Sequence, residues 1–373
     1  MAALYRTSKI STPPQKNRPR IGLLRRELQQ IPRMLLVRLR SLGDAILTLP
    51  LIEALHGWRP DLKLDILIEE PYAPVFKNHP AINEVLIVGA RPLLGFSGWT
   101  RFRAAVEIRK RRYPAVLNLH GGTTSLLFTA ASGAGLRFGQ ASHRGSWLYN
   151  AQIPSSASIW RRQSLHTAEH QLTVLHWLEL PIPSECVGSL YVGNEARDRI
   201  RNRLAAVGIS TYFLIQPTAT LATKQWNPGN YAQLGDMLSR RYGIPVIYTA
   251  APHETRVLQE VRKESREQHI YWSDLPLMDL FALIEGCRLF VGNDSGPMHA
   301  AAALKKPIVV VWGSSDFQAW HPWGTRYEAI LSELPCIPCP GYTCKAFGEP
   351  KCILDITITR VADACERILA GIT

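Results

Sequence analysis

The sequence predicts an α/β protein made of two doubly wound halves, each built around a parallel sheet. Short apolar runs alternate with helical patterns, which is typical of consecutive βαβ units, and the same alternation restarts near residue 210. The chain has 373 residues, which fits two domains of roughly 100–200 residues each. The longest apolar run is shorter than the ~20 residues that a membrane-spanning helix needs.

In the first half, buried strands are predicted at residues 34–39, 64–68, 85–88 and 115–119. A helix pattern follows the first of these strands, and a basic helix is predicted over 101–112. In the second half, the predicted strands are 212–216, 245–249, 289–291 and 307–312, and the predicted helices are 229–242, 254–267 and 278–285.

The boundary between the two halves is predicted near residue 185, where Pro181 and Pro183 interrupt the helical pattern of 165–208. The expected divisions are a basic extension at 1–32, a first Rossmann-like domain at 33–185 and a second at 186–373. Ligands of doubly wound sheets bind at the carboxyl ends of the strands, so the cleft between the domains is the expected site.

The positive charge is concentrated at the beginning of the chain. The net charge is +13, and residues 1–40 hold ten Lys or Arg against one Glu. Ile21, Leu24, Leu28 and Ile31 lie near helical spacing, which fits an amphipathic helix on an anionic membrane surface. A solvated arm fits the same composition. Either way we expect a cytoplasmic protein, with peripheral contact to the inner membrane under the first alternative, and no nucleic-acid partner, because the arm lacks interleaved aromatic residues.

Ser41-Leu42-Gly43-Asp44 follows the first predicted strand and is the first candidate site. Gly43 permits a tight turn or a close approach of a ligand to the backbone. Asp44 at the start of a helix fits a capping carboxylate, or a general base that accepts a proton from an incoming hydroxyl.

The second half offers three further corners that each follow a strand. The loop from Gly292 to His299 opens a helix, where Ser295, Gly296 and the following amides favour a phosphate; a plain strand-to-helix corner fits as well. Lys224 can neutralise a diphosphate or be a solvated side chain, and Glu254 can bind a ligand or complement a helix dipole. The sequence contains neither a P-loop nor a G-x-G-x-x-G motif, which argues against the nucleotidases and dinucleotide enzymes that use them.

Four cysteines fall within seventeen residues, as Cys336-x2-Cys339-x4-Cys344-x7-Cys352 in a segment spanning 336–352. The spacing fits a small structural zinc site with thiolate ligands. The reduced thiols of a packed loop fit better, because a second CxxC pair is missing.

The chain resembles glycosyltransferase family 9, the bacterial lipopolysaccharide heptosyltransferases. The motifs that carry this resemblance are RSLGDAILTLPLIEAL, TATLATKQWNPGNYAQL and FVGNDSGPMHAAAALKKPIVVVWGSSD. The resemblance covers about residues 33–370. It implies a GT-B fold, with an acceptor domain first and a nucleotide-sugar domain second.

The resemblance further implies inverting transfer of a heptose from ADP-heptose to an anionic glycolipid acceptor of the lipopolysaccharide core, without a required cofactor. By this resemblance, Asp44 is the general base. Thr220 and Lys224 contact the diphosphate, and Glu254 holds the ribose. Asp294 binds heptose hydroxyls, while Ser295, Gly296 and His299 face the phosphates.

Three other activities stay open at this point. The same motifs serve transferases that use another nucleotide sugar or another glycan. An epimerase of the same architecture would act on a single sugar nucleotide, and it would need a second acid–base pair besides Asp44.

Overall fold

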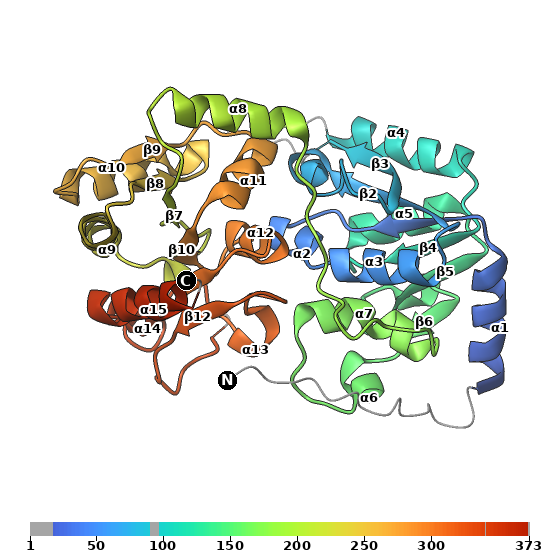
Figure 1. The fold of residues 1–373 in the computed structure, drawn as a ribbon. Coiled ribbons are helices and arrows are strands. Elements are labelled where there is room, and N and C mark those ends of the chain that lie inside the picture. The colour runs from blue at the N-terminus through green and yellow to red at the C-terminus, as the bar shows by residue number, and fades with distance from the viewer. Residues whose placement is uncertain (1–17, 90–96, 340, 372–373) are drawn as a thin grey trace. The chain divides into compact units, whose positions relative to one another are not determined.

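The computed structural model describes residues 18–89, 97–339 and 341–371, and it divides the chain into two compact units. Unit 1 is Met1–Leu190 and unit 2 is Tyr191–Thr373. Each unit has a parallel six-stranded sheet with helices around it (Figure 1). The predicted class of two doubly wound α/β halves is therefore confirmed. The division follows Leu190, whereas the sequence predicts a boundary near 185.

The sheet of unit 1 has the strand order β3-β2-β1-β4-β5-β6. Its strands are β1 (Arg33–Val37), β2 (Lys63–Glu69), β3 (Ile82–Val88), β4 (Ala115–Asn118), β5 (Leu136–Gln140) and β6 (Ala151–Ile153). The α-helices are α1 (Arg18–Gln30), α2 (Leu42–Ile46), α3 (Leu49–Trp58), α4 (Ser97–Lys110), α5 (Thr123–Ser132), α6 (Ser156–Trp160) and α7 (Thr167–Trp177). Two short 3-10 helices, η2 (Glu70–Val75) and η3 (Ser146–Leu148), lie in loops.

The sheet of unit 2 has the strand order β12-β11-β10-β7-β8-β9. Its strands are β7 (Phe213–Gln216), β8 (Val246–Thr249), β9 (Ile270–Trp272), β10 (Leu289–Asn293), β11 (Ile308–Val311) and β12 (Tyr327–Ile330). The helices are α8 (Asn194–Ala205), η4 (Ala222–Lys224), α9 (Pro228–Tyr242), η5 (Pro252–Glu254), α10 (Thr255–Glu264), α11 (Leu277–Gly286), α12 (Gly296–Ala303), α13 (Phe317–Trp320), α14 (Lys351–Leu354) and α15 (Ile358–Ala370).

The central strands are buried on both faces, which explains their mainly apolar sequences. In β7, for example, Phe213, Leu214 and Ile215 are all fully buried although successive side chains point to opposite faces. In unit 2, one of these faces packs against α9, α10 and α15. In unit 1, α4 and α5 share a core cluster with β1, β2, β3 and β4.

Each sheet has one point at which the strand order reverses, called its switch point. In unit 1 it lies between β1 and β4, which pair directly, and in unit 2 between β10 and β7. Crevices at the carboxyl ends of such neighbouring strands are the usual ligand sites of open α/β sheets. The fold therefore indicates one candidate position in each unit.

Residues 18–31 belong to unit 1 and do not form a separate extension or a solvated arm. Four apolar side chains on α1 and directly after it are buried, those of Ile21, Leu24, Leu28 and Ile31. Arg59 Nη1 donates to the carbonyl oxygens of Leu28, Gln29 and Ile31 at 3.0, 2.8 and 3.0 Å and so satisfies carbonyls at the end of α1. The apolar face predicted to contact a membrane is thus occupied by the protein itself. The rest of the predicted extension, residues 1–17, lies outside the described residues.

Candidate functional site

Asp44 lies at the switch point of unit 1, in the first turn of α2 directly after β1. Its Oδ2 accepts hydrogen bonds from the hydroxyl and the backbone N–H of Ser41, at 3.0 and 3.4 Å. Ser41 is the N-cap residue, so Asp44 is not the cap itself. About a quarter of its side chain, 27%, stays exposed. The carboxylate is therefore held at the helix start and still reachable by a proton donor, while Gly43 is buried within α2.

A buried guanidinium lies beside this carboxylate. Arg38 Nη1 is 3.3 Å from Asp44 Oδ1, and the Arg38 side chain is almost completely buried. Within the described part of the chain, its Nε and Nη2 are buried without a hydrogen-bond partner. Burial lowers the pKa of Arg38, and the nearby Asp44 offsets part of this effect. Unit 1 therefore holds an incompletely paired positive charge next to the candidate base.

His120 follows β4, the strand beside β1, and faces the same charges. Burial, with Arg38 and Arg40 as the next causes, lowers the pKa of His120 to about 4. Its imidazole is consequently neutral at neutral pH. Gly121 beside it has a positive φ of 71°, and a Cβ there would lie 2.6 Å from the ring of His143. This turn needs glycine for two separate reasons.

In unit 2, two residues seventy positions apart meet at the other switch point. Lys224 Nζ lies 2.6 Å from Asp294 Oδ2, and the Asp294 side chain is 4% exposed. Ser315 Oγ donates to the same carboxylate oxygen. Lys224 ends η4 in the loop after β7, and Asp294 directly follows β10. The pair is thus formed by the two loops that the strand order brings together.

Glu254 lies at the corresponding corner after β8. Its Oε2 accepts a hydrogen bond from Thr218 Oγ1 at 2.7 Å and from the backbone N–H of Ala251 at 3.1 Å. Thr218 is fully buried, whereas Thr220 is exposed. The two hydroxyls of the Pro-Thr-Ala-Thr segment therefore have different surroundings, and Thr218 is the one bonded to Glu254.

The loop after β10 opens α12 as the sequence predicts, with Ser295 as its N-cap residue and Gly296 as its first residue. Ser295 Oγ donates to Gln216 Oε1 at 3.1 Å, which links this loop to the end of β7. His299 is buried one turn further along, with its ring centroid 6.1 Å from that of Trp320. Asn293 fixes the corner, since its Oδ1 accepts from the backbone N–H of Trp226 at 3.2 Å.

Comparison with known proteins decides the family. The model of "Glycosyltransferase family 9 (heptosyltransferase)" matches residues 101–348, well over half of the chain. The chain belongs to glycosyltransferase family 9. This confirms the resemblance seen in the motifs, and the protein is a glycosyltransferase.

Relatives and solved structures of this family-9 chain agree with the assignment. It is 27% identical over 292 residues to "Lipopolysaccharide heptosyltransferase 3" of Escherichia coli (strain K12), covering 76% of this chain and 83% of that protein. A family 9 glycosyl transferase from Veillonella parvula has a TM-score of 0.78 at 20% identity, with 91% and 98% of the two chains covered. The E. coli ADP-heptose lps heptosyltransferase II has a TM-score of 0.76 at 20% identity, with 91% and 99% covered. At this identity the two structures show the GT-B fold alone.

The four clustered cysteines of this glycosyltransferase line one cavity of about 470 Å³ together with Thr223 and Ser314. They are Cys336, Cys339, Cys344 and Cys352, and all seven cysteines of the chain are free thiols. Burial and the three neighbouring thiols raise the pKa of Cys352 to about 11. Among the residues that the structure describes, no three His, Cys, Asp or Glu side chains are grouped so that they could hold a metal ion. The zinc hypothesis therefore stays a prediction.

The cysteine segment also braces the loop that carries Lys224. Thr223 Oγ1 donates to the Gly341 carbonyl oxygen at 3.2 Å, and Ser314 Oγ donates to Thr223 Oγ1 at 2.9 Å. The backbone N–H of Cys339 donates to the Ser314 carbonyl oxygen at 2.8 Å. Residues 336–352 thus contribute to the position of the Lys224 loop through these hydrogen bonds.

Sequence reasoning missed Arg38 and His120. An arginine just after a strand is typical of a surface side chain, so its burial is not evident from the pattern. His120 lies in the Asn-Leu-His-Gly-Gly corner that follows a predicted strand. Its position after a strand is equivalent to that of Asp44, and this could have identified His120 as a candidate site residue.

Proposed function

We propose that this chain is an inverting glycosyltransferase that transfers a heptose from ADP-heptose to a sugar hydroxyl of a lipopolysaccharide core acceptor. Its curated relatives include proteins named lipopolysaccharide heptosyltransferase 3 and heptosyltransferase 1, which support heptosyl transfer. The name of one structural neighbour specifies ADP-heptose. The observation that carries the proposal is the Lys224–Asp294 pair at one switch point, together with Asp44 at the other.

In the proposed reaction, Asp44 takes the proton of the acceptor hydroxyl while that oxygen forms a bond to the anomeric carbon of the heptose. The bond from this carbon to the phosphate oxygen breaks, and its electron pair leaves with ADP. A positioned base and a neutralised leaving group are the two requirements of such a displacement. No protein-bound intermediate is needed.

Unit 2 supplies the groups that suit the donor. Lys224 and the free amides at Ser295 and Gly296 would neutralise the diphosphate, with the hydroxyl of Thr220 and the ring of His299 as further contacts. Asp294 would accept hydrogen bonds from heptose hydroxyls, and Glu254 from the ribose hydroxyls.

On the acceptor side, the positive charges of Arg38 and Arg40 support an anionic substrate. A lipopolysaccharide precursor is both anionic and held in a membrane, so we propose that the enzyme works at the cytoplasmic face of the inner membrane. In the described part of the chain, no helix has the length and apolar character to cross a bilayer. Docking would then be peripheral.

The test is the Asp44→Asn variant, assayed with ADP-heptose and a panel of core acceptors. Asparagine keeps an oxygen that can accept from Ser41, so the start of α2 should persist while the proton acceptor is lost. We expect turnover to fall by about 10²–10⁴, with unchanged ADP-heptose affinity.

The matched control is Ser41→Ala, which removes a hydrogen bond to the same carboxylate and should cost far less turnover. Near-normal turnover in Asp44→Asn would refute the base assignment. Conversion of ADP-heptose into an isomer without an acceptor would indicate the epimerase alternative.

A further inference from the structure

We propose that the outer face of α4, formed by Trp99, Phe102 and Val106, is the surface by which this protein docks on an anionic lipid bilayer. These three side chains are defined here as the α4 face. They are 66%, 58% and 36% exposed. The inference rests on the proposed function only in that the acceptor is held in a membrane.

The α4 face is an apolar stripe that the core does not use. Its residues are spaced by three and four positions, so they lie on one side of the helix. The rings of Trp99 and Phe102 are stacked, with centroids 5.8 Å apart. The opposite side of α4 packs on the core of unit 1, where Ile108 is buried. Large apolar side chains that cluster on the surface indicate an interaction site.

Two more large apolar side chains are exposed on elements near α4. α5 packs beside α4 on the same face of the sheet. Its Leu127 is 68% exposed, although Leu126 and Phe128 on either side are buried. Trp147, in the η3 segment that contacts α5, is also highly exposed.

The charged residues around the α4 face are mostly basic, which favours an anionic partner. Residues 97–112 contain six Lys or Arg and one Glu. Arg103, Arg109, Lys110 and Arg112 are exposed. Helices that lie in the headgroup region of a bilayer typically carry tryptophan and phenylalanine flanked by basic side chains. A second copy of this chain would bring like charges together at the same face, which disfavours self-association there.

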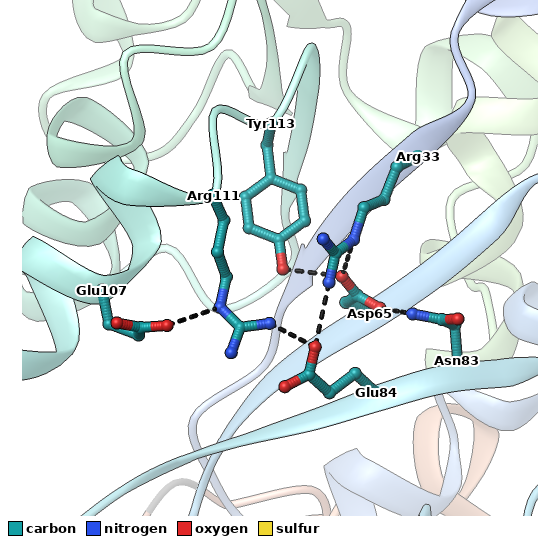
Figure 2. A network of polar contacts seen from close by, with 7 residues as sticks. All are labelled: Arg33, Asp65, Asn83, Glu84, Glu107, Arg111 and Tyr113. Atoms are coloured by element: carbon teal, nitrogen blue, oxygen red, sulfur yellow. Dashed lines mark hydrogen bonds and ion pairs between the residues drawn. The ribbon is translucent and has the colours of Figure 1, made fainter.

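A polar network holds α4 in place (Figure 2). Arg111, just after the helix, pairs with Glu84 of β3 and donates from Nε to Glu107 Oε1 at 3.1 Å. Glu84 also accepts from Arg33 Nη2 at 2.9 Å, and Arg33 pairs with the fully buried Asp65. The ion pair with Arg111 lowers the pKa of Glu84, so this carboxylate stays charged at neutral pH. The α4 face is thus presented on a fixed helix, and docking requires little ordering.

The test is co-sedimentation with vesicles of phosphatidylethanolamine and phosphatidylglycerol, without donor or acceptor. The variant is the double substitution Trp99→Gln and Phe102→Gln, and the matched control is Leu23→Gln, whose side chain on α1 is also 58% exposed. We expect the double variant to lose about tenfold or more in vesicle affinity, and the control to bind like the wild-type chain. Vesicles of phosphatidylcholine alone should bind the wild-type chain weakly.

Equal binding by the double variant and the wild-type chain would overturn the proposal, as would failure of the wild-type chain to bind the anionic vesicles. A change of oligomeric state in the double variant with unchanged vesicle binding would assign the face to a second copy instead. Because the substituted positions are exposed, thermal unfolding should match the wild-type curve. Transfer to a lipid-free acceptor should also persist, so failure of docking is distinguishable from failure of the proposed reaction.

Discussion

The Asp294→Asn substitution separates a structural role of the buried ion pair from a role in sugar binding. The carboxylate oxygen of Asp294 accepts from both Lys224 and Ser315, and asparagine keeps one accepting oxygen but no charge. A hydrogen bond to a charged group contributes about 1.5–3 kcal/mol, against about 0.5–1.5 kcal/mol for a neutral one. We therefore expect the variant to lose roughly 1–1.5 kcal/mol of stability, which lowers Tm by about 2–6 °C in a unit of this size.

The same substitution should affect the two ligands differently. ADP has no heptose, and Lys224 without its counter-charge is more available to the diphosphate, so ADP should bind as well as it does to the wild-type chain or better. ADP-heptose loses its charge-assisted bonds to Asp294, and its use should fall by one to two orders of magnitude, equivalent to about 1.5–3 kcal/mol.

Calorimetric titration of each variant with ADP and with ADP-heptose measures this difference. Lys224→Ala is the reference, because it removes the ammonium and should weaken both ligands. If Asp294→Asn weakens ADP and ADP-heptose equally, Asp294 acts on the phosphate side and the assignment of its role to the heptose is refuted.

Two further predictions concern unit 1. Leu28→Ala should lower the free energy of unfolding by about 2–5 kcal/mol in denaturant unfolding, because Leu28 is 2% exposed. Leu23→Ala, on the exposed side of α1, should leave the free energy of unfolding nearly unchanged. Equal effects of the two substitutions would contradict the packing of α1. In an NMR titration, the pKa of His120 should be about 4 and should rise in Arg38→Gln, and an unchanged value would exclude the influence of Arg38. Because folding lowers this pKa below its ordinary value, the unfolded chain binds the extra proton, and stability should fall as the pH drops from about 6.5 to 4.

Central strands are predictable from this sequence, whereas edge strands other than β3 are not. β1, β2, β7 and β11 are buried on both faces, so each appears as a predominantly apolar run within two residues of its observed bounds. β5, β6, β9 and β12 were missed. They are short strands at or next to a sheet edge, and sequences such as Tyr-Glu-Ala-Ile mix polar and apolar residues because only part of the strand is buried.

The candidate site shows a similar division. Four site residues were predictable because each follows a strand, and the parallel strands of a sheet bring their carboxyl ends to one edge of that sheet. They are Asp44 in unit 1 and Lys224, Glu254 and Asp294 in unit 2. Their contacts were not predictable, since the pairing of Lys224 with Asp294 depends on loops seventy residues apart.

The Pro-Thr-Ala-Thr segment gives a second example of this limit. The sequence offers two hydroxyls two positions apart, which simple alternation would turn to the same side, but the path of the loop gives them different surroundings. Thr218 is buried against Glu254, while Thr220 is exposed. A pattern of residue types locates the segment, but only the path of the backbone distinguishes its members.

The two switch points use charge in different ways, and this difference supports the separate roles proposed for them. In unit 2, Lys224 and Asp294 neutralise each other, so an entering diphosphate can compete for an ammonium that is already in position. In unit 1, Arg38 and Arg40 lie near Asp44, and they help to keep His120 neutral. With its pKa lowered to about 4 and a hydrogen bond to the Arg40 backbone, this imidazole has no advantage over a carboxylate as a proton acceptor. Of the groups near Arg38, which include His120 and His143, Asp44 is the one that carries negative charge, and the positive charge around it favours an anionic acceptor.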